Sequence, residues 1–177
     1  MKTRSNKQTG FTIIEVLMYL GLFTILCGGA VACAYNIIQV SSRNQTKSMV
    51  QEEGNYLLAK INWALSGVDA INEVDPTFLS VNKITGLDTN NQPIIMPITI
   101  GMPARDLIIS YPGNPAPNTF TLNNSNIQIT DLNFSHTLGT GGGANPESVR
   151  VAFTITAKTE TGADYAQIFS TTVFLRK

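Results

Sequence analysis

An isolated carboxylate stands inside an apolar run close to the first residue of the chain. Glu15 lies in the stretch GFTIIEVL, residues 10–17, and no further charged residue occurs before Arg43. A charged side chain at the centre of a bilayer costs about 2.5–3.5 kcal/mol on insertion scales, so such a residue usually has a partner or a function. Glu15 is therefore the first candidate functional residue, and electrostatic pairing is the chemistry it offers.

A short basic segment precedes the apolar run. Residues 1–10 include Lys2, Arg4 and Lys7 but no acidic residue, which is typical of a flank that stays on the cytoplasmic side during insertion. The uncharged run that follows is longer than the roughly 20 residues needed to cross the hydrocarbon. The sequence predicts one membrane-spanning helix with its basic end inside.

Together, the basic segment, Gly10, Phe11 and the run TIIEVL resemble the amino-terminal motif of the type IV pilin and type II secretion pseudopilin superfamily. The resemblance implies that prepilin peptidase cuts after Gly10 and that the new terminal residue, Phe11, is N-methylated. It also implies that Glu15 pairs with the terminal amine of a neighbouring subunit in a filament. This agrees with the physics, because an amine and a carboxylate that are each costly in an apolar bundle offset one another when paired.

The same resemblance implies partners and a location. The partners are the prepilin peptidase/methyltransferase, other pilin or pseudopilin subunits, an inner-membrane assembly platform and, before assembly, membrane lipid. The implied location is the inner membrane, which the chain crosses once, with its head outside the cytoplasm. After assembly the subunit belongs to a periplasmic or cell-surface filament. A weaker likeness of residues 57–61 and 172–176 to J-type minor pseudopilins and minor pilins implies a subunit that primes or caps a pilus, secretion or DNA-uptake filament.

A long helix and a sheet-rich head must position these residues. Leu57, Ile61 and Leu65 fall close to helical spacing, which predicts that the helix continues to about Leu65 with an apolar face that packs under a sheet. Gly54 is expected to weaken it, and Ser66-Gly67 to end it. The predicted organisation is a cleaved leader (1–10), a membrane or filament-core helix (11–40), its amphipathic continuation (41–67) and a β-rich head (68–177), an α+β fold.

Within the head, short runs rich in Thr, Ile and Val alternate with turn residues, which predicts an antiparallel sheet. The last two runs are expected to form a hairpin. The predicted strands are Phe78–Ile84, Ile94–Ile100, Asp106–Tyr111, Thr119–Leu122, Ile127–Leu138, Val149–Lys158 and Tyr165–Arg176.

Composition and motifs indicate a mechanical role, with no enzyme activity, cofactor or metal. Twelve basic residues balance twelve acidic ones, and loss of the three leader charges leaves nine against twelve, or −3, so no footprint for nucleic acid is evident. His136 follows Leu132 and Phe134 at period two and is expected to be a partly buried sheet residue. The acidic turn at Asp88 supplies one carboxylate, which is too few charged ligands for a calcium site that needs 6–8 oxygens.

The glycine run at residues 141–143 predicts a flexible surface loop, because it lacks the lysine and helix of a phosphate-binding loop.

Three alternatives for the chain stay open. The apolar helix can be a plain signal anchor with an incidental Glu15. The segment Ala30-Val31-Ala32 before Cys33 also fits a cleaved, lipidated leader. In a third reading the chain is a membrane-anchored or lipidated extracytoplasmic binding protein. Cys27 and Cys33 point to different helix faces and cannot pair within one chain.

Overall fold

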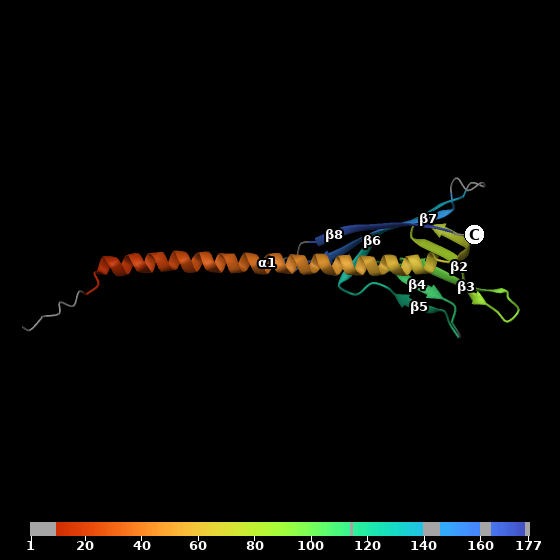
Figure 1. Ribbon diagram of the computed structural model, residues 1–177, viewed down its shortest axis with the longest axis horizontal. Helices are drawn as coiled ribbons and strands as arrows, with labels where there is room; N and C mark the ends of the chain where they lie inside the picture. The colour runs from red at the N-terminus through yellow and green to blue at the C-terminus, as the bar shows by residue number, and fades with distance from the viewer. Residues whose placement is uncertain (1–9, 114, 140–145, 160–163, 176–177) are drawn as a thin grey trace, which may run out of the picture. The chain divides into compact units, whose positions relative to one another are not determined.

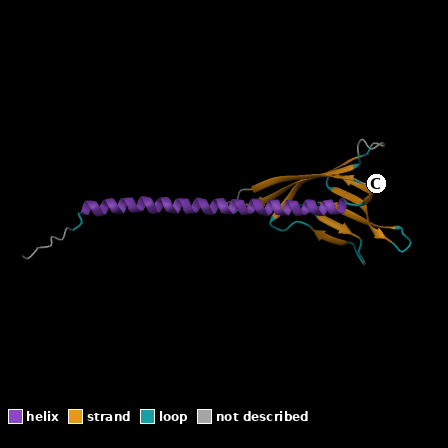
Figure 2. Ribbon diagram, in the orientation of Figure 1, coloured by secondary structure: helices purple, strands orange, loops and turns teal. Residues whose placement is uncertain are grey.

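The computed structural model describes residues 10–113, 115–139, 146–159 and 164–175, which form one long helix followed by eight strands (Figures 1 and 2). The elements are α1 (Ile13–Leu65), β1 (Val68–Asp75), β2 (Phe78–Leu87), β3 (Pro93–Gly101), β4 (Ile108–Tyr111), β5 (Asn118–Thr121), β6 (Ile127–Thr137), β7 (Ser148–Lys158) and β8 (Asp164–Phe174). The α+β, pilin-like architecture predicted from the sequence is confirmed.

Two compact units divide the chain, one up to Ser42 and the other from Arg43 onward. In the first unit α1 runs without interruption through Gly28 and Gly29, and its large apolar side chains are exposed. By length and composition α1 is able to cross a membrane, since an 18-residue window reaches a mean hydropathy of 2.1 with none of its residues buried. This exposure has a simple physical meaning, because such a surface is stable only in lipid or against other chains.

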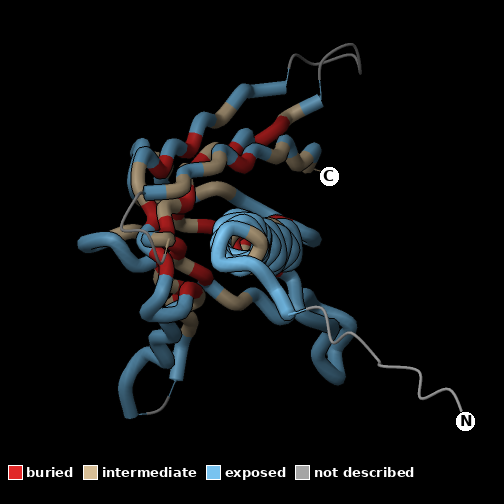
Figure 3. The backbone as a smooth tube through the Cα atoms, turned by 90° about the vertical axis from the view of Figure 1, so that its left-hand side faces the viewer, coloured by how far each residue is buried: buried red, intermediate tan, exposed pale blue. Residues whose placement is uncertain are grey.

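The second unit, the head, contains the end of α1 and two antiparallel sheets. The sheets have the orders β1-β2-β3-β4-β5 and β6-β7-β8, and the Phe134 N–H joins them by donating to the Pro76 carbonyl at 2.9 Å. Leu57 and Ile61 of α1 are fully buried in one apolar cluster with side chains from both sheets, and Figure 3 shows the buried positions along the strands. The predicted apolar face of the helix is confirmed.

All seven predicted strands are present, and their ends agree within three residues. The final hairpin is also confirmed, since β7 and β8 pair antiparallel from Ser148↔Phe174 to Lys158↔Asp164. The predicted helix end is confirmed as well: α1 stops at Leu65, and Gly67 has φ +71°, the left-handed conformation that glycine adopts at helix ends.

Strand β1 is absent from the sequence prediction, and its irregular pairing explains why. Its register with β2 shifts twice, between Val68 and Ala70 and between Ile71 and Glu73. Each bulge inserts an extra residue and turns the following side chains over. Val68, Ile71 and Val74 consequently contact the core at a spacing of three, so the period of two that identifies a strand is lost.

Gly54 has a packing role that the sequence prediction missed. A Cβ built at this position lies 2.1 Å from Phe169 Cζ and 2.3 Å from Phe169 Cε1. The Phe169 ring is buried and stacks on Phe153 at a centroid distance of 5.7 Å. The glycine therefore lets an aromatic ring of β8 press against the helix backbone, which outweighs the roughly 1 kcal/mol of helix propensity it costs relative to alanine.

We expect Gly54→Ala to lower the free energy of unfolding of the head by about 1–2 kcal/mol, because overpacking of this kind costs about 1–3 kcal/mol and the gain in helix propensity offsets part of it. Thermal unfolding of residues 42–177, followed by circular dichroism, measures the change. Gly86→Ala is the matched control, since a Cβ there meets no atom within 4 Å. In the background Phe169→Leu the Gly54→Ala penalty should shrink or reverse, and an undiminished penalty contradicts the packing account.

Candidate functional site

The predicted processing and docking residues lie together at the start of α1. The helix begins at Ile13, and the Thr12 carbonyl accepts its first hydrogen bonds, from the N–H groups of Glu15 at 3.1 Å and Val16 at 3.2 Å. Thr12 thus occupies the N-cap position and Glu15 the third helical position, the sequence pattern of a capping box. An acidic residue in the first turn also interacts favourably with the helix dipole.

The capping-box spacing Thr12-x-x-Glu15 was not recognised in the sequence analysis. Glu15 is half-buried, whereas its neighbours in the first unit are exposed. The Tyr19 hydroxyl donates to Glu15 Oε1 at 3.4 Å. An ionised carboxylate has about four acceptor sites, so this long hydrogen bond leaves most of its capacity for other donors.

Gly10 and Phe11 are open to approach by another molecule. A Cβ built at Gly10 meets no atom of the described residues within 4 Å. Steric contact with those residues therefore does not require glycine at this position. Phe11 is 76% exposed and, with Tyr19 and Phe23, lines a shallow apolar hollow of about 470 Å³. The leader charges Lys2, Arg4 and Lys7 lie outside the described residues.

The other sequence candidates have local structural partners. His136 is a half-buried residue of β6, as predicted, and its Nε2 lies 2.9 Å from Glu147 Oε1. The Asp88 carboxylate accepts the N–H groups of Asn90 at 2.8 Å and Gln92 at 2.9 Å, so it stabilises its own turn. Within the described ranges no three His, Cys, Asp or Glu side chains are placed to hold a metal ion. The glycine run at 141–143 falls outside those ranges.

Lys83 caps the end of α1, a role that the sequence analysis did not identify. The last turn of α1 has no basic residue, and Lys83 Nζ on β2 donates to the Trp63 carbonyl at 2.5 Å, to the Ser66 carbonyl and to Ser66 Oγ at 2.9 Å. A cation at this end interacts favourably with the helix dipole. Burial lowers the pKa of the Lys83 ammonium from its usual value. The sequence does contain a signal for the burial of Lys83, because Lys83 follows Leu79 and Val81 at a spacing of two and so lies on the same inward face of β2.

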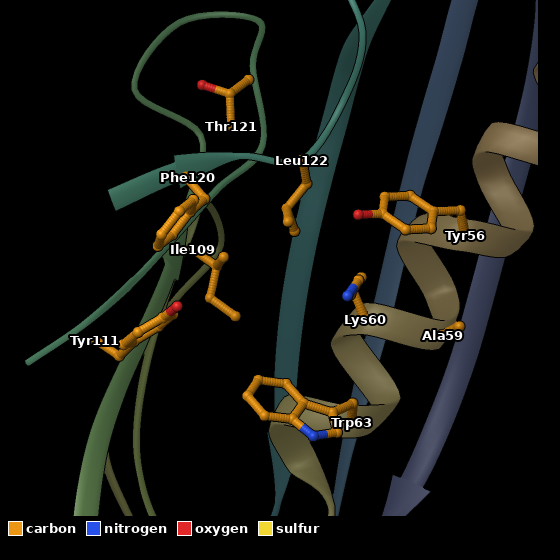
Figure 4. Close-up of a pocket in the computed structure, with 9 residues that line it drawn as sticks. All are labelled: Tyr56, Ala59, Lys60, Trp63, Ile109, Tyr111, Phe120, Thr121 and Leu122. Atoms are coloured by element: carbon orange, nitrogen blue, oxygen red, sulfur yellow. The ribbon is translucent and has the colours of Figure 1, made fainter. Parts of the chain in front are cut away.

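A groove opens in the head between α1 and the β4–β5 hairpin, and we call it the head groove. Tyr56, Lys60 and Trp63 project into it from α1, facing Ile109, Tyr111 and Phe120 of the hairpin (Figure 4). Its volume is about 510 Å³. The groove was not predicted from the sequence.

Comparison with known proteins gives one match, at the amino-terminal motif. Residues 5–31, which include Gly10, Phe11 and Glu15, match the family described as the prokaryotic N-terminal methylation motif. No curated protein and no solved structure matches the chain. The match supports a type IV pilin-like leader of the kind that prepilin peptidase processes, and α1, which follows it, is long and apolar enough to anchor the chain in a membrane.

Proposed function

We propose that this chain is a minor pilin-like or pseudopilin subunit that prepilin peptidase processes and that then assembles into, primes or caps a filament. In this proposal residues 1–10 are removed, 11–40 cross the membrane and later enter the filament core, 41–67 continue the helix, and 68–177 form the exported head. The observation that carries the proposal is the Gly10-Phe11 junction directly before an apolar helix that bears Glu15 in its first turn.

The proposed docking role of Glu15 follows from its place in that helix. After cleavage, Phe11 would carry a terminal ammonium at the end of an apolar helix, where it is costly without a partner. A neighbouring subunit shifted along the filament can present Glu15 to that ammonium, and Glu15 keeps acceptor capacity beyond its hydrogen bond with Tyr19. Pairing between subunits thus removes two unfavourable groups from lipid at once.

A narrower role is proposed from two short stretches. Residues 57–61 lie in the part of α1 that packs in the head, and residues 172–174 close β8, the two regions with likeness to J-type minor pseudopilins. That likeness supports a position near the filament tip, in contact with other minor subunits and an inner-membrane assembly platform. The presence of Glu15 argues against the subtype of the family that lacks this glutamate.

A second candidate function is a membrane-anchored or lipidated binding protein, in which the head recognises a ligand and the helix only tethers it. The head groove is the observation that favours it. The proposed docking through Phe11 and Glu15 does not use this groove, whereas ligand recognition by the head would use it.

The intact mass of the native protein, purified from its own membranes, tests the proposal. We expect the mass of a chain that begins at Phe11 and carries one added methyl group on its terminal amine. A chain that retains residues 1–10, or one that begins at a lipidated Cys33, contradicts the pilin-like function and supports the anchored binding protein. Fragmentation of the terminal peptide locates the methyl group and excludes methylation elsewhere.

A further inference from the structure

The head groove carries chemistry that the proposed filament role does not use. Its aromatic residues are half-accessible in the monomer: Tyr56 is 45%, Trp63 47% and Phe120 48% exposed. Below them Ile109 is almost completely buried. Aromatic rings over an aliphatic floor offer a large apolar area at a low cost in side-chain entropy, which is typical of surfaces that bind other molecules.

The walls of the groove are held in place before any ligand arrives. On the helix side, Lys83 Nζ donates to the Trp63 carbonyl and lies 4.9 Å from the centroid of the Trp63 ring. On the hairpin side, Tyr111 and Phe120 stack with their centroids 5.5 Å apart. A preformed site loses less conformational entropy on binding than a flexible one.

The charge of the groove selects an anionic ligand. Lys60 lies 5.4 Å from the centroid of the Tyr56 ring, and Figure 4 shows its ammonium between the helix and the hairpin. None of the described residues that line the groove is an aspartate or glutamate, and the positions three and four residues from Lys60 on α1 carry no acid. A carboxylate held among apolar groups is therefore the complement of this surface.

The dimensions of the groove suit a short extended segment. From Tyr56 to Trp63 the helix rises about 10 Å, which is the length of about three extended residues, and 510 Å³ lies in the range of ligand sites. We propose that the head groove binds an extended peptide segment of a partner protein, in which an acidic residue stands between large apolar side chains. This proposal does not depend on cleavage after Gly10.

Trp63 is the only tryptophan of the chain, so its fluorescence reports on the groove directly. The experiment titrates the full-length protein in lipid nanodiscs with the peptide acetyl-Gly-Ser-Leu-Asp-Phe-Ser-Gly-amide and with its Asp→Asn counterpart. We expect a saturable change in Trp63 emission with both and an affinity about fivefold higher for the aspartate peptide, the upper range for an ion pair open to solvent. High salt should remove this preference.

Two variants and a matched control locate the binding. Lys60→Gln should abolish the preference for aspartate while retaining the response of Trp63. Phe120→Ala should weaken both peptides alike, because it removes apolar contact and no charge. Lys47→Gln is the control, since Lys47 also lies on α1 over an aromatic ring, 5.9 Å from the centroid of Tyr165, but does not line the groove.

Three results overturn the proposal. The first is equal affinity of the wild-type protein for the two peptides, and the second is an unchanged preference in Lys60→Gln. The third is a response to 3-phenylpropanoate with none to either peptide, which makes the groove a site for a free aromatic carboxylate. Circular dichroism of each variant separates loss of binding from loss of fold.

Discussion

Replacing Gly10 with leucine is expected to abolish removal of the leader, so that the native chain keeps residues 1–10 while it still inserts into the membrane. Packing among the described residues gives no reason for glycine here, because a Cβ meets none of their atoms within 4 Å and α1 begins only at Ile13. In the proposed function, the need for a small residue comes from the peptidase that receives this segment. Intact mass and membrane fractionation measure processing and insertion separately, and the processed form should fall below detection.

Gly21→Leu is the matched control for this substitution. Gly21 lies in the same unit, and a Cβ built on it also meets nothing within 4 Å. Leucine there raises the hydrophobicity of the helix without touching the junction, so processing should be normal. If Gly10→Leu is still processed to the normal length, Gly10 is not part of the cleavage site, and the pilin-like assignment is contradicted.

The sequence predicts those parts of the fold where local pattern and tertiary packing agree. The helical spacing of Leu57 and Ile61 identified the face that is buried, and Ser66-Gly67 identified the end of α1. Strands β7 and β8 were predicted as a hairpin because period-two alternation survives in regular pairing. In these elements each residue's own preference and its final environment require the same conformation.

The remaining features depend on contacts between residues that are distant in the chain. Gly54 was expected only to weaken α1, because nothing nearby in sequence reveals that Phe169 presses against it. Lys83 caps a helix that ended many residues earlier, and the head groove requires α1 and the β4–β5 hairpin to be brought together. In β1 the two bulges removed the period of two by which a strand is recognised in sequence. The residues proposed for processing and docking were accessible from sequence because they lie in one contiguous motif, which the family match covers.

Glu15 needs a test that separates two roles, since it stands at the third helical position of a capping-box pattern and the proposed function gives it a partner in another subunit. Glutamate and glutamine both serve at the third position of a capping box, whereas only glutamate carries the charge that a terminal ammonium needs. Glu15→Gln therefore preserves the first role and removes the second. Glu15→Val removes both and also deletes a charge from the apolar segment, so insertion should be unchanged or improved.

The association constant for assembly of Glu15→Val is expected to fall by about two to three and a half decades. Removing one partner of a buried ion pair costs about 3–5 kcal/mol, and each 1.4 kcal/mol is tenfold. The variant should accumulate in the membrane, processed but poorly recruited, and Glu15→Gln should be intermediate or equally defective. In-cell chemical crosslinking of the subunit into larger complexes, with Glu52→Gln as the control for an exposed glutamate of the same helix, measures recruitment. If Glu15→Gln gives the wild-type yield of crosslinked complexes and only Glu15→Val is defective, then Glu15 acts only at the helix cap. If both variants give the wild-type yield, the anchored binding protein is favoured.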